Sequence, residues 1–377
     1  SCALISFAPS TIQMVALEVM VTLIRAVGDF VPPHLKWAAV VVQIYLVAAF
    51  TIARELISEL LWPKAHRECV DAIMASPFMR KRIDKMQSGT PPMALVTGAD
   101  GTIGSQIVFL LIKLGFTVSA LSGSATKMRQ IIAEWSAIER ARVKVYQVNF
   151  VEPIRMQTYL ENLCERIDQI DVVVLSAGTM LNTEGPVNGF EHHEWVNVIS
   201  QAMVVKAMEE KMAEDVRIIA LSSVCAHLNL CEELTEEELL TSGKFGLYEA
   251  YARSKFNLAV YCEQLARDYS TSLDRPSRIV VSAHPGVVPG GLYRHVNPLI
   301  RWISDSAAHL TRSPVMAATL VLHTALRSDA KSGAYYEDRT VTALRPDIAN
   351  EKRHAIYKRI EAAVDEALPP RQQRSSE

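Results

Sequence analysis

Six short apolar runs rich in β-branched residues, each followed by a stretch of helical length, constrain the fold of this chain more than any other feature. The stretches between the runs carry mixed charge, as helices with one solvent-exposed face do. Strands that alternate with helices in this way form a parallel sheet covered by helices on both faces. We therefore predict a Rossmann-type, doubly wound α/β fold, with strands at 93–97, 117–121, 143–148, 171–175, 217–222 and 278–283.

Ligands of such a sheet bind beyond the carboxyl ends of its strands, so the residues that follow each strand bear most directly on function. The first strand runs into a glycine-rich turn in the stretch ALVTGADGTIG at 94–104, with Gly98, Gly101 and Gly104. Gly98 permits a tight turn, Gly101 is expected to add backbone freedom, and Gly104 lets the next helix pack closely. Amides at the start of that helix can bind a pyrophosphate, so the turn predicts a dinucleotide site.

The ends of the second and fourth strands refine this prediction. Ser122 stands near the position where a strict NAD site has an acidic residue for the ribose 2′-hydroxyl. Lys127 and Arg129 follow and can meet a 2′-phosphate, so we expect NADP(H), with NAD(H) as the alternative. After the fourth strand, Ala177 and Gly178 offer a surface of small residues on which a cofactor can lie.

A serine pair and a tyrosine–lysine pair supply groups for proton transfer. Ser222 and Ser223 come at the fifth strand's end, and the later sequence YARSK places Tyr251 and Lys255 on one helix face. A free tyrosine titrates at about pH 10 and is a poor base at neutral pH, but an adjacent ammonium group lowers its pKa. Proton exchange with an alcohol or carbonyl then becomes feasible, while a serine hydroxyl hydrogen-bonds the substrate oxygen.

The glycine-rich turn, the serine pair and the YxxxK motif, in this order, resemble the short-chain dehydrogenase/reductase superfamily over residues 93–345. The stretches YARSKFNLAVYCEQLARDY and SAHPGVVPGGLYRHV are most similar to its retinol-dehydrogenase-like branch, and there to the X-linked dehydrogenase/reductase group associated with polyprenol and dolichol metabolism. The resemblance implies that Tyr251 is the general acid/base and that Lys255 lowers its pKa and holds the nicotinamide ribose. It further implies that Ser223 orients the substrate oxygen and that Asn197 supports a water-linked proton relay.

Several positions depart from the family's cofactor-binding pattern. Thr102 stands where TGxxxGxG has glycine, Asn149 where an aspartate contacts adenine, and Gly290 where a threonine helps to bind the nicotinamide carboxamide. None of these changes touches the proton-transfer groups, so we expect cofactor binding to be retained. The implied cofactor site comprises Gly98, Gly101, Thr102, Ile103, Gly104, Ser122, Asn149, Ala177, Gly178, Tyr251, Lys255, Pro285 and Gly286.

The N-terminal part of the chain carries an uncharged apolar run at 37–53, and an earlier apolar segment at 12–24 that contains Glu18. The length of the run is at the lower limit for a membrane-spanning helix. We expect membrane attachment, through one spanning helix or through two segments that enter one leaflet. The alternative is a helical hairpin packed on the main domain. Basic residues follow the run, which favours a cytosolic main domain.

Charge and cysteine content exclude other classes of function. The 39 lysines and arginines nearly balance the 41 aspartates and glutamates, which argues against nucleic acid as the main partner. The six cysteines have no spacing suited to zinc or to a disulfide framework, so we expect reduced thiols and no metal site. We expect a membrane-associated segment at 1–62, a basic linker at 63–92, the Rossmann-type domain at 93–345, and a helix and tail at 346–377.

Together these features predict a membrane-attached oxidoreductase that interconverts a lipophilic alcohol, of retinoid, polyprenol, dolichol or steroid type, with its aldehyde or ketone. The alternative is a non-catalytic scaffold subunit that keeps the fold, with or without bound NADP(H). We expect the endoplasmic reticulum membrane as its location, with lipid droplets or the mitochondrial membrane as alternatives, and the resemblance implies a homodimer. Segment 292–312 is expected to form either a lid on the membrane surface or a helix beside the pocket.

Overall fold

The computed structural model describes residues 31–228, 244–296 and 310–368, together with residues 19, 20, 22–24, 26, 302 and 306. Its centre is an eight-stranded sheet with the order β3-β2-β1-β4-β5-β6-β7-β8, in which only β7 and β8 pair antiparallel. The strands are β1 (Met93–Thr97), β2 (Thr117–Ser122), β3 (Val143–Gln147), β4 (Ile170–Leu175), β5 (Met212–Leu221), β6 (Ile279–His284), β7 (Tyr335–Glu337) and β8 (Thr340–Val341).

The parallel sheet confirms the predicted α/β fold, and each of the six predicted strands corresponds to one of β1 to β6. β5 begins earlier than predicted because Met212 already pairs with Ile170, across an irregularity in the register with β4. The sequence did not predict β7 and β8. They have three and two residues, too few to show an alternating pattern.

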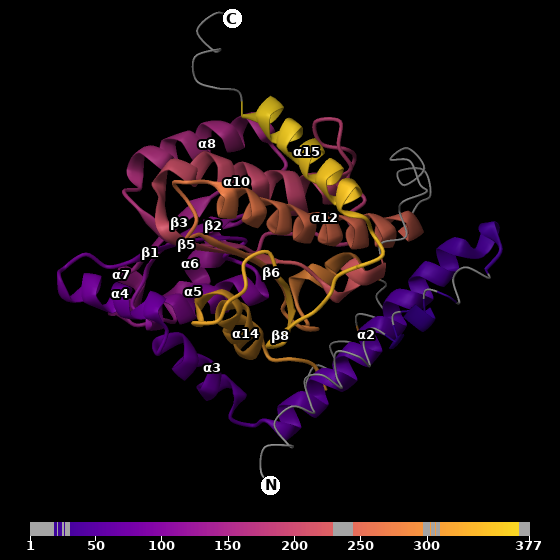
Figure 1. The fold of residues 1–377 in the computed structure, drawn as a ribbon, viewed down its shortest axis with the longest axis horizontal. Coiled ribbons are helices and arrows are strands. Elements are labelled where there is room, and N and C mark those ends of the chain that lie inside the picture. The colour runs from indigo at the N-terminus through magenta and orange to yellow at the C-terminus, as the bar shows by residue number, and fades with distance from the viewer. Residues whose placement is uncertain are drawn as a thin grey trace, which may run out of the picture.

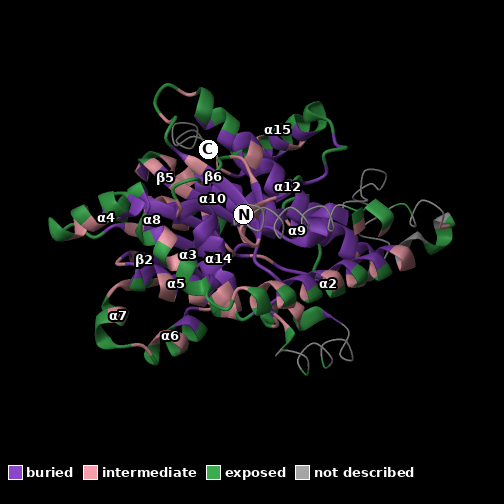
Figure 2. Cartoon of the chain, turned by 60° about the horizontal axis from the view of Figure 1, so that its bottom comes forward, coloured by how far each residue is buried: buried purple, intermediate pink, exposed green. Residues whose placement is uncertain are grey.

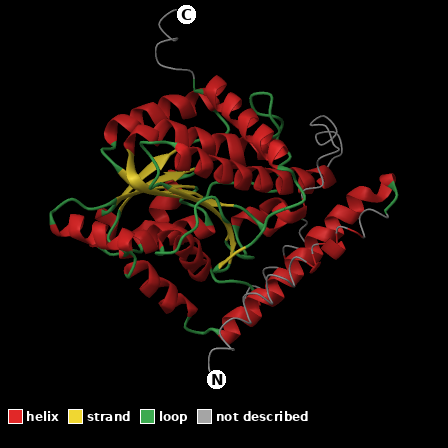
Figure 3. Ribbon diagram, in the orientation of Figure 1, coloured by secondary structure: helices red, strands yellow, loops and turns green. Residues whose placement is uncertain are grey.

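Helices cover both faces of the sheet, whose strands lie between them (Figure 1, Figure 3). Along β1, Leu95 belongs to the apolar core on one face, whereas Ala94 and Val96 belong to the core on the other. Because both faces are buried, the strands carry apolar residues without alternation. One core includes residues of α8 (Pro153–Arg166), α10 (Ser200–Met208), α12 (Lys244–Thr271) and α15 (Asn350–Ala367); the other includes residues of α3 (Ala65–Met74), α4 (Pro77–Gln87), α5 (Thr102–Lys113), α6 (Ala125–Ala133) and α14 (Pro314–Leu326).

The apolar run lies in α2 (Lys36–Leu61), which packs along the domain against η4 (Val224–Leu228) and α12 (Figure 1). The segment Ala38–Leu61 is long and apolar enough to cross a membrane, but 39% of its most apolar window is buried against the rest of the chain. The buried positions recur every three or four residues, so they form one stripe of the helix. They are Val40, Gln43, Ile44, Val47, Thr51, Arg54 and Glu55.

The opposite side of α2 is exposed and also apolar (Figure 2). Val42, Leu46, Ile57 and Leu60 are between 52% and 72% exposed. The buried Gln43 donates from Nε2 to the carbonyl of Ile24 at 2.8 Å, so the described end of the earlier apolar segment lies beside α2. The contact agrees with the alternative of a hairpin packed on the domain, and within the described part of the chain one apolar face of α2 stays uncovered.

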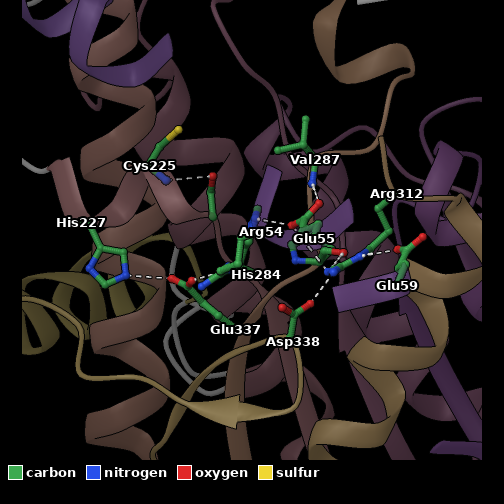
Figure 4. A network of polar contacts seen from close by, with 12 residues as sticks. Arg54, Glu55, Glu59, Cys225, His227, His284, Val287, Arg312, Glu337 and Asp338 are labelled. Atoms are coloured by element: carbon green, nitrogen blue, oxygen red, sulfur yellow. Dashed lines mark hydrogen bonds and ion pairs between the residues drawn. The ribbon is translucent and has the colours of Figure 1, made fainter. Parts of the chain in front are cut away.

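A buried ionic network holds the carboxyl-terminal half of α2 (Figure 4). Arg54 Nη2 lies 2.8 Å from Glu337 Oε2, and Glu337 Oε1 is 2.8 Å from His227 Nε2. Burial alone would raise the pKa of Glu337, but the His227 hydrogen bond and the Arg54 charge hold that pKa well below its ordinary value. Glu337 thereby joins α2, η4 and β7.

The neighbouring residue of α2 reaches the loop that follows β6. Glu55 Oε2 accepts a hydrogen bond from the Val287 amide at 3.1 Å, and Glu55 Oε1 lies 3.5 Å from Arg312 Nη1. Arg312, 2% exposed, also pairs with Asp338 and with Glu59. The charges on this part of α2 are therefore buried in contacts with the domain.

Other predictions fall partly outside the described residues. Cys69, Cys164, Cys225 and Cys262 are free thiols, as expected, while residues 2 and 231 lie outside the description. Within 292–312, only 292–296, 302, 306 and 310–312 are described, so the expected lid or flanking helix stays a prediction.

Replacing Arg54 by methionine is expected to lower the free energy of unfolding by about 3 kcal/mol, because a buried carboxylate loses its main cation. The matched control is Lys206→Met, which removes the Lys206–Asp365 pair, whose side chains are 40% and 60% exposed. Such a solvated pair contributes less than about 1 kcal/mol. Urea unfolding in detergent micelles measures both. Equal midpoints for the two variants would show that the network does not hold α2 in place.

Candidate active site

The predicted site residues come together at the carboxyl edge of the sheet, because the first six strands are parallel and end at that edge. Gly98 to Gly104 follow β1, Ser122 ends β2, and Asn149 follows β3. Ala177 and Gly178 follow β4, Ser223 follows β5, and Pro285 and Gly286 follow β6. Tyr251 and Lys255 come from α12, and Asn197 lies in η2 (Trp195–Ile199), a turn of π-helix of the kind often found at functional sites.

The glycine-rich turn packs tightly against the end of β4. Gly98 has a φ of +62°, and a Cβ there would lie 2.7 Å from the Ala177 Cα. A Cβ on Gly104 would lie 2.2 Å from the Gly98 carbonyl oxygen, so neither position accepts a side chain. Gly101, the N-cap of α5, has a φ of −74°, which any residue adopts. The expectation that Gly101 supplies backbone freedom is therefore wrong: that freedom is needed at Gly98.

Thr97, the last residue of β1, fixes the geometry between this turn and β4. Its Oγ1 accepts hydrogen bonds from the Ser176 and Ala177 amides, both at 3.0 Å. The same hydroxyl donates to Gln201 Oε1 on α10 at 2.7 Å. The buried Thr97 side chain thus fixes the distance between the end of β1, which Gly98 follows, and the end of β4, after which Gly178 lies.

Asn197 and Lys255 converge on Gly178. A Cβ on Gly178 would lie 3.1 Å from Asn197 Oδ1 and 3.2 Å from Lys255 Nζ. Asn197 accepts from the Thr179 amide at 2.7 Å and donates to Ser254 Oγ at 2.8 Å. Lys255 Nζ donates to the Leu221 carbonyl at 2.9 Å, which ties the cation to the end of β5.

Tyr251 and Ser223 form the second half of the site. The Ser223 hydroxyl is hydrogen-bonded to the Tyr251 side chain and also accepts from the Cys225 amide at 3.2 Å. Tyr251 is 4% exposed and Ser223 is 7% exposed. Lys255 Nζ lies 5.9 Å from the centre of the Tyr251 ring. The structure therefore brings all four predicted proton-transfer residues into one buried cluster.

The protonation of this cluster differs from the sequence-based expectation. Burial raises the pKa of Tyr251 above its ordinary value, an effect that the Ser223 hydrogen bond only partly offsets. Burial lowers the pKa of Lys255 to about 8. The ammonium group is bonded to a carbonyl, and desolvation outweighs its influence on the phenol. In the free protein Tyr251 is thus a proton donor at neutral pH, while Lys255 loses its charge as the pH rises through about 8.

Two buried hydroxyls make the carboxyl edge of the sheet suitable for a polar ligand. Ser122 Oγ and Thr179 Oγ1 are buried, and neither has a hydrogen-bond partner in the part of the chain that the structure describes. Buried hydroxyls are normally satisfied, so these two suit a bound group that supplies the missing partners. Asn149 instead uses its side chain locally, because it donates to Glu152 Oε1 at 2.5 Å and accepts from the Val151 amide at 3.2 Å.

Sequence reasoning missed an acidic group at the end of β2. Asp100, from the glycine-rich turn, accepts a hydrogen bond from the Gly123 amide at 3.1 Å. An acid was expected only among the residues that follow β2, whereas this carboxylate comes from the loop that follows β1. Lys127 and Arg129, expected to meet a 2′-phosphate, are exposed on α6.

Sequence reasoning also missed a buried histidine beside Tyr251. The His193 ring packs edge-on against the Tyr251 ring, with centroids 6.4 Å apart. His193 Nδ1 is 2.6 Å from Glu191 Oε1, and both side chains are buried. The sequence EHHEWVN, which leads into Asn197, was the available signal.

An apolar cluster of side chains surrounds Tyr251, and α2 contributes to it. Val40, Ile44 and Val47 belong to the same apolar cluster as Tyr251. Tyr45 of α2 and Tyr248 of α12 share a hydrogen bond of 2.8 Å between their hydroxyls. The cluster is completed by Met180, Leu181, Val224, Cys225, Leu228, Ala252 and Val296. A substrate that reaches Tyr251 meets aliphatic and aromatic surface.

The chain is similar to known proteins in sequence and in fold. A family model for short chain dehydrogenases matches residues 92–233. Human polyprenol dehydrogenase is 22% identical over 270 residues, which cover 70% of this chain and 75% of the relative. The mouse protein of the same name is 25% identical over 292 residues, covering 72% and 85%. The fold is shared with the crystal structure of an uncharacterized protein from Mycobacterium paratuberculosis, with a TM-score of 0.52, 16% identity, and coverage of 74% of this chain and 93% of that one.

The two glycines of the turn lead to opposite expectations. Gly104→Ala places a methyl group 2.2 Å from a backbone oxygen, so we expect at least tenfold weaker dinucleotide binding and a loss of about 1 to 3 kcal/mol in stability. Gly101→Ala meets the same oxygen at 3.0 Å in an ordinary conformation, so binding should stay within about threefold. Fluorescence titration with reduced dinucleotide and thermal unfolding separate the two. Stronger loss at Gly101 would refute this account of the turn.

Proposed function

The chain belongs to the short-chain dehydrogenase/reductase family, and from that premise we propose a membrane-attached oxidoreductase that interconverts a lipophilic alcohol and its carbonyl form. The observation that carries the proposal is the buried cluster of Tyr251, Ser223, Lys255 and Asn197, surrounded by apolar side chains. These apolar surroundings suit the lipophilic substrates expected from the sequence, and the relatives named polyprenol dehydrogenase support the same substrate class.

A nicotinamide dinucleotide, when bound, supplies or accepts the hydride. Gly98 and Gly104 let the turn pack closely against the end of β4, and Ser122 and Thr179 offer the dinucleotide unpaired hydroxyls at the same edge of the sheet. The protein contributes the proton and the orientation. The Ser223 hydroxyl hydrogen-bonds the substrate oxygen, where charge develops. The Tyr251 hydroxyl, next to Ser223, exchanges the proton with that oxygen.

The protonation state of the free protein suits carbonyl reduction. Tyr251 is buried and protonated at neutral pH, so it can donate to the oxygen of an aldehyde or ketone while the carbonyl carbon gains the hydride. Lys255 is charged below about pH 8 and lies on the same helix face, where its charge stabilises the phenolate left behind. Alcohol oxidation needs the reverse transfer and therefore a deprotonated Tyr251.

We further propose NAD(H) as the preferred cofactor, rather than the NADP(H) that Lys127 and Arg129 suggest. The Asp100 carboxylate lies at the end of β2, where an acid binds the ribose 2′-hydroxyl in folds of this kind. A 2′-phosphate at about 4 Å from this carboxylate would be disfavoured by about 1 to 4 kcal/mol.

Membrane attachment is proposed through the uncovered side of α2, with the helix in the plane of one leaflet. The buried stripe of α2 contacts the domain through Arg54, Glu55 and the apolar cluster around Tyr251, so a spanning orientation would break these contacts. The exposed stripe of Val42, Leu46, Ile57 and Leu60 is apolar, as an interfacial helix requires. This arrangement would bring the apolar cluster around Tyr251 close to the membrane, where a lipophilic substrate is dissolved.

The activity is tested with the full chain in detergent and a panel of retinoid, polyprenol and steroid alcohols and carbonyls, with each cofactor in turn. We expect turnover with at least one pair and a kcat/KM at least about fivefold higher with NAD(H) than with NADP(H). Tyr251→Phe should lower kcat by at least a hundredfold, since the proton donor is lost. Tyr357→Phe, on α15 and bonded to Asp268, is the matched control and should keep full activity. Absence of dinucleotide binding would favour a scaffold instead.

Attachment is tested by flotation with phosphatidylcholine liposomes. Leu46→Glu combined with Leu60→Glu should reduce the floated fraction at least tenfold, because two leucines no longer enter the apolar layer. The control is Leu273→Glu, at a position that is 96% exposed after α12 and far from α2. Flotation of the double variant at the wild-type level would exclude this face as the membrane contact.

A further inference from the structure

Two departures from the family pattern, far apart in the sequence, meet in space. Thr102 begins α5 directly after Gly101, and Gly290 lies in the loop after β6, just before η5 (Gly291–His295). A Cβ on Gly290 would lie 2.2 Å from Thr102 Oγ1 and 2.9 Å from Thr102 Cβ. The Thr102 side chain therefore occupies the volume that any side chain at position 290 would need.

Because of this contact, the two departures from the family pattern amount to one exchange of a side chain between positions 290 and 102. The family pattern has glycine at 102 and threonine at 290, whereas this chain has threonine at 102 and glycine at 290. Only one of the two positions can carry a side chain in this packing, since heavy atoms 2.2 Å apart overlap. If an unused cofactor site had been lost through independent substitutions, there would be no reason for a glycine at 290 to leave space for the threonine at 102.

The position of the Thr102 hydroxyl suits the binding of a ligand. Thr102 Oγ1 has no hydrogen-bond partner among the described residues, and it lies between the glycine-rich turn and the loop that contains Pro285 and Gly286. Both segments lie at the carboxyl edge of the sheet, the same edge as the orphaned hydroxyls of Ser122 and Thr179. A hydroxyl that bonds a charged phosphoryl oxygen strengthens binding more than one that bonds a neutral group.

We propose that Thr102 and Gly290 are a compensated pair, in which the Thr102 hydroxyl donates a hydrogen bond to the pyrophosphate of the bound dinucleotide and Gly290 provides the space. The proposal rests on the proposed function, because it assigns a residue of the same cofactor site. It also explains why the loop after β6 carries a glycine with an extended backbone, φ 161°, where no left-handed conformation requires one.

A double-variant cycle tests the pairing with the full chain in detergent. Gly290→Thr alone should bind NADH at least tenfold more weakly and unfold at a lower temperature, because its side chain overlaps Thr102. Thr102→Gly alone should weaken binding about tenfold through loss of the hydroxyl. The combined variant should return to within about threefold of wild type in affinity and recover the lost thermal stability. Losses that simply multiply in the combined variant would overturn the pairing.

Two conservative variants test the hydroxyl separately from its volume. Thr102→Val keeps the shape, so it should unfold like wild type but bind NADH about tenfold more weakly, whereas Thr102→Ser should bind within about threefold of wild type. Wild-type affinity in Thr102→Val would overturn the role of the hydroxyl. A wild-type protein that binds neither NADH nor NADPH overturns that role together with the proposed function. The unfolding measurements need no cofactor, so they still support or refute the packed pair on their own.

Discussion

The buried carboxylate of Glu337 is the charge on which the arrangement of the site depends. It lies at the end of β7 and contacts Arg54 of α2 and His227 of η4. A buried carboxylate without a cation destabilises a protein by several kcal/mol, so the elements that carry these groups must stay together. η4 directly follows Ser223, and the residue next to Arg54 supports the loop after β6 through the Val287 amide. One ionic network therefore connects α2, the segment that follows Ser223 and the loop after β6.

This network makes the apolar N-terminal helix α2 part of the packed domain. By composition α2 qualifies as a membrane anchor, yet its buried stripe supplies part of the wall around Tyr251. In the proposed attachment, one helix serves both as the anchor and as part of the surroundings of Tyr251, with opposite faces for the two environments. A substrate that leaves the bilayer along α2 would stay in contact with apolar side chains on its way to the proton donor. We therefore expect the activity to depend on how α2 packs against the domain.

Local chemistry explains what the sequence predicted well and what it did not. The six long strands were found because both faces of a parallel sheet are buried, which leaves continuous apolar runs in the sequence. Tyr251 and Lys255 were singled out because their spacing on one helix is visible in sequence, whereas Ser223 and Asn197 were assigned through the family resemblance. Asp100 and Glu55 were missed because each comes from an element whose local pattern gives no sign of its contact. His193 was missed although the stretch EHHEWVN marked it, since its packing against Tyr251 is a tertiary contact. The protonation of Tyr251 was misjudged because burial, which decides it, is a property of the packed chain.

The sequence by itself determined the class of fold, the places of six strands along the chain and the glycine-rich turn with Gly98 and Gly104. These depend on periodicity and on short spacings, which the chain carries locally. Only the tertiary structure decided that α2 lies on the domain and that an acid stands at the end of β2. It also decided that Thr102 fills the space at Gly290. Each of these is a contact between segments distant in sequence, and such contacts exist only once the sheet has brought its strand ends to one edge.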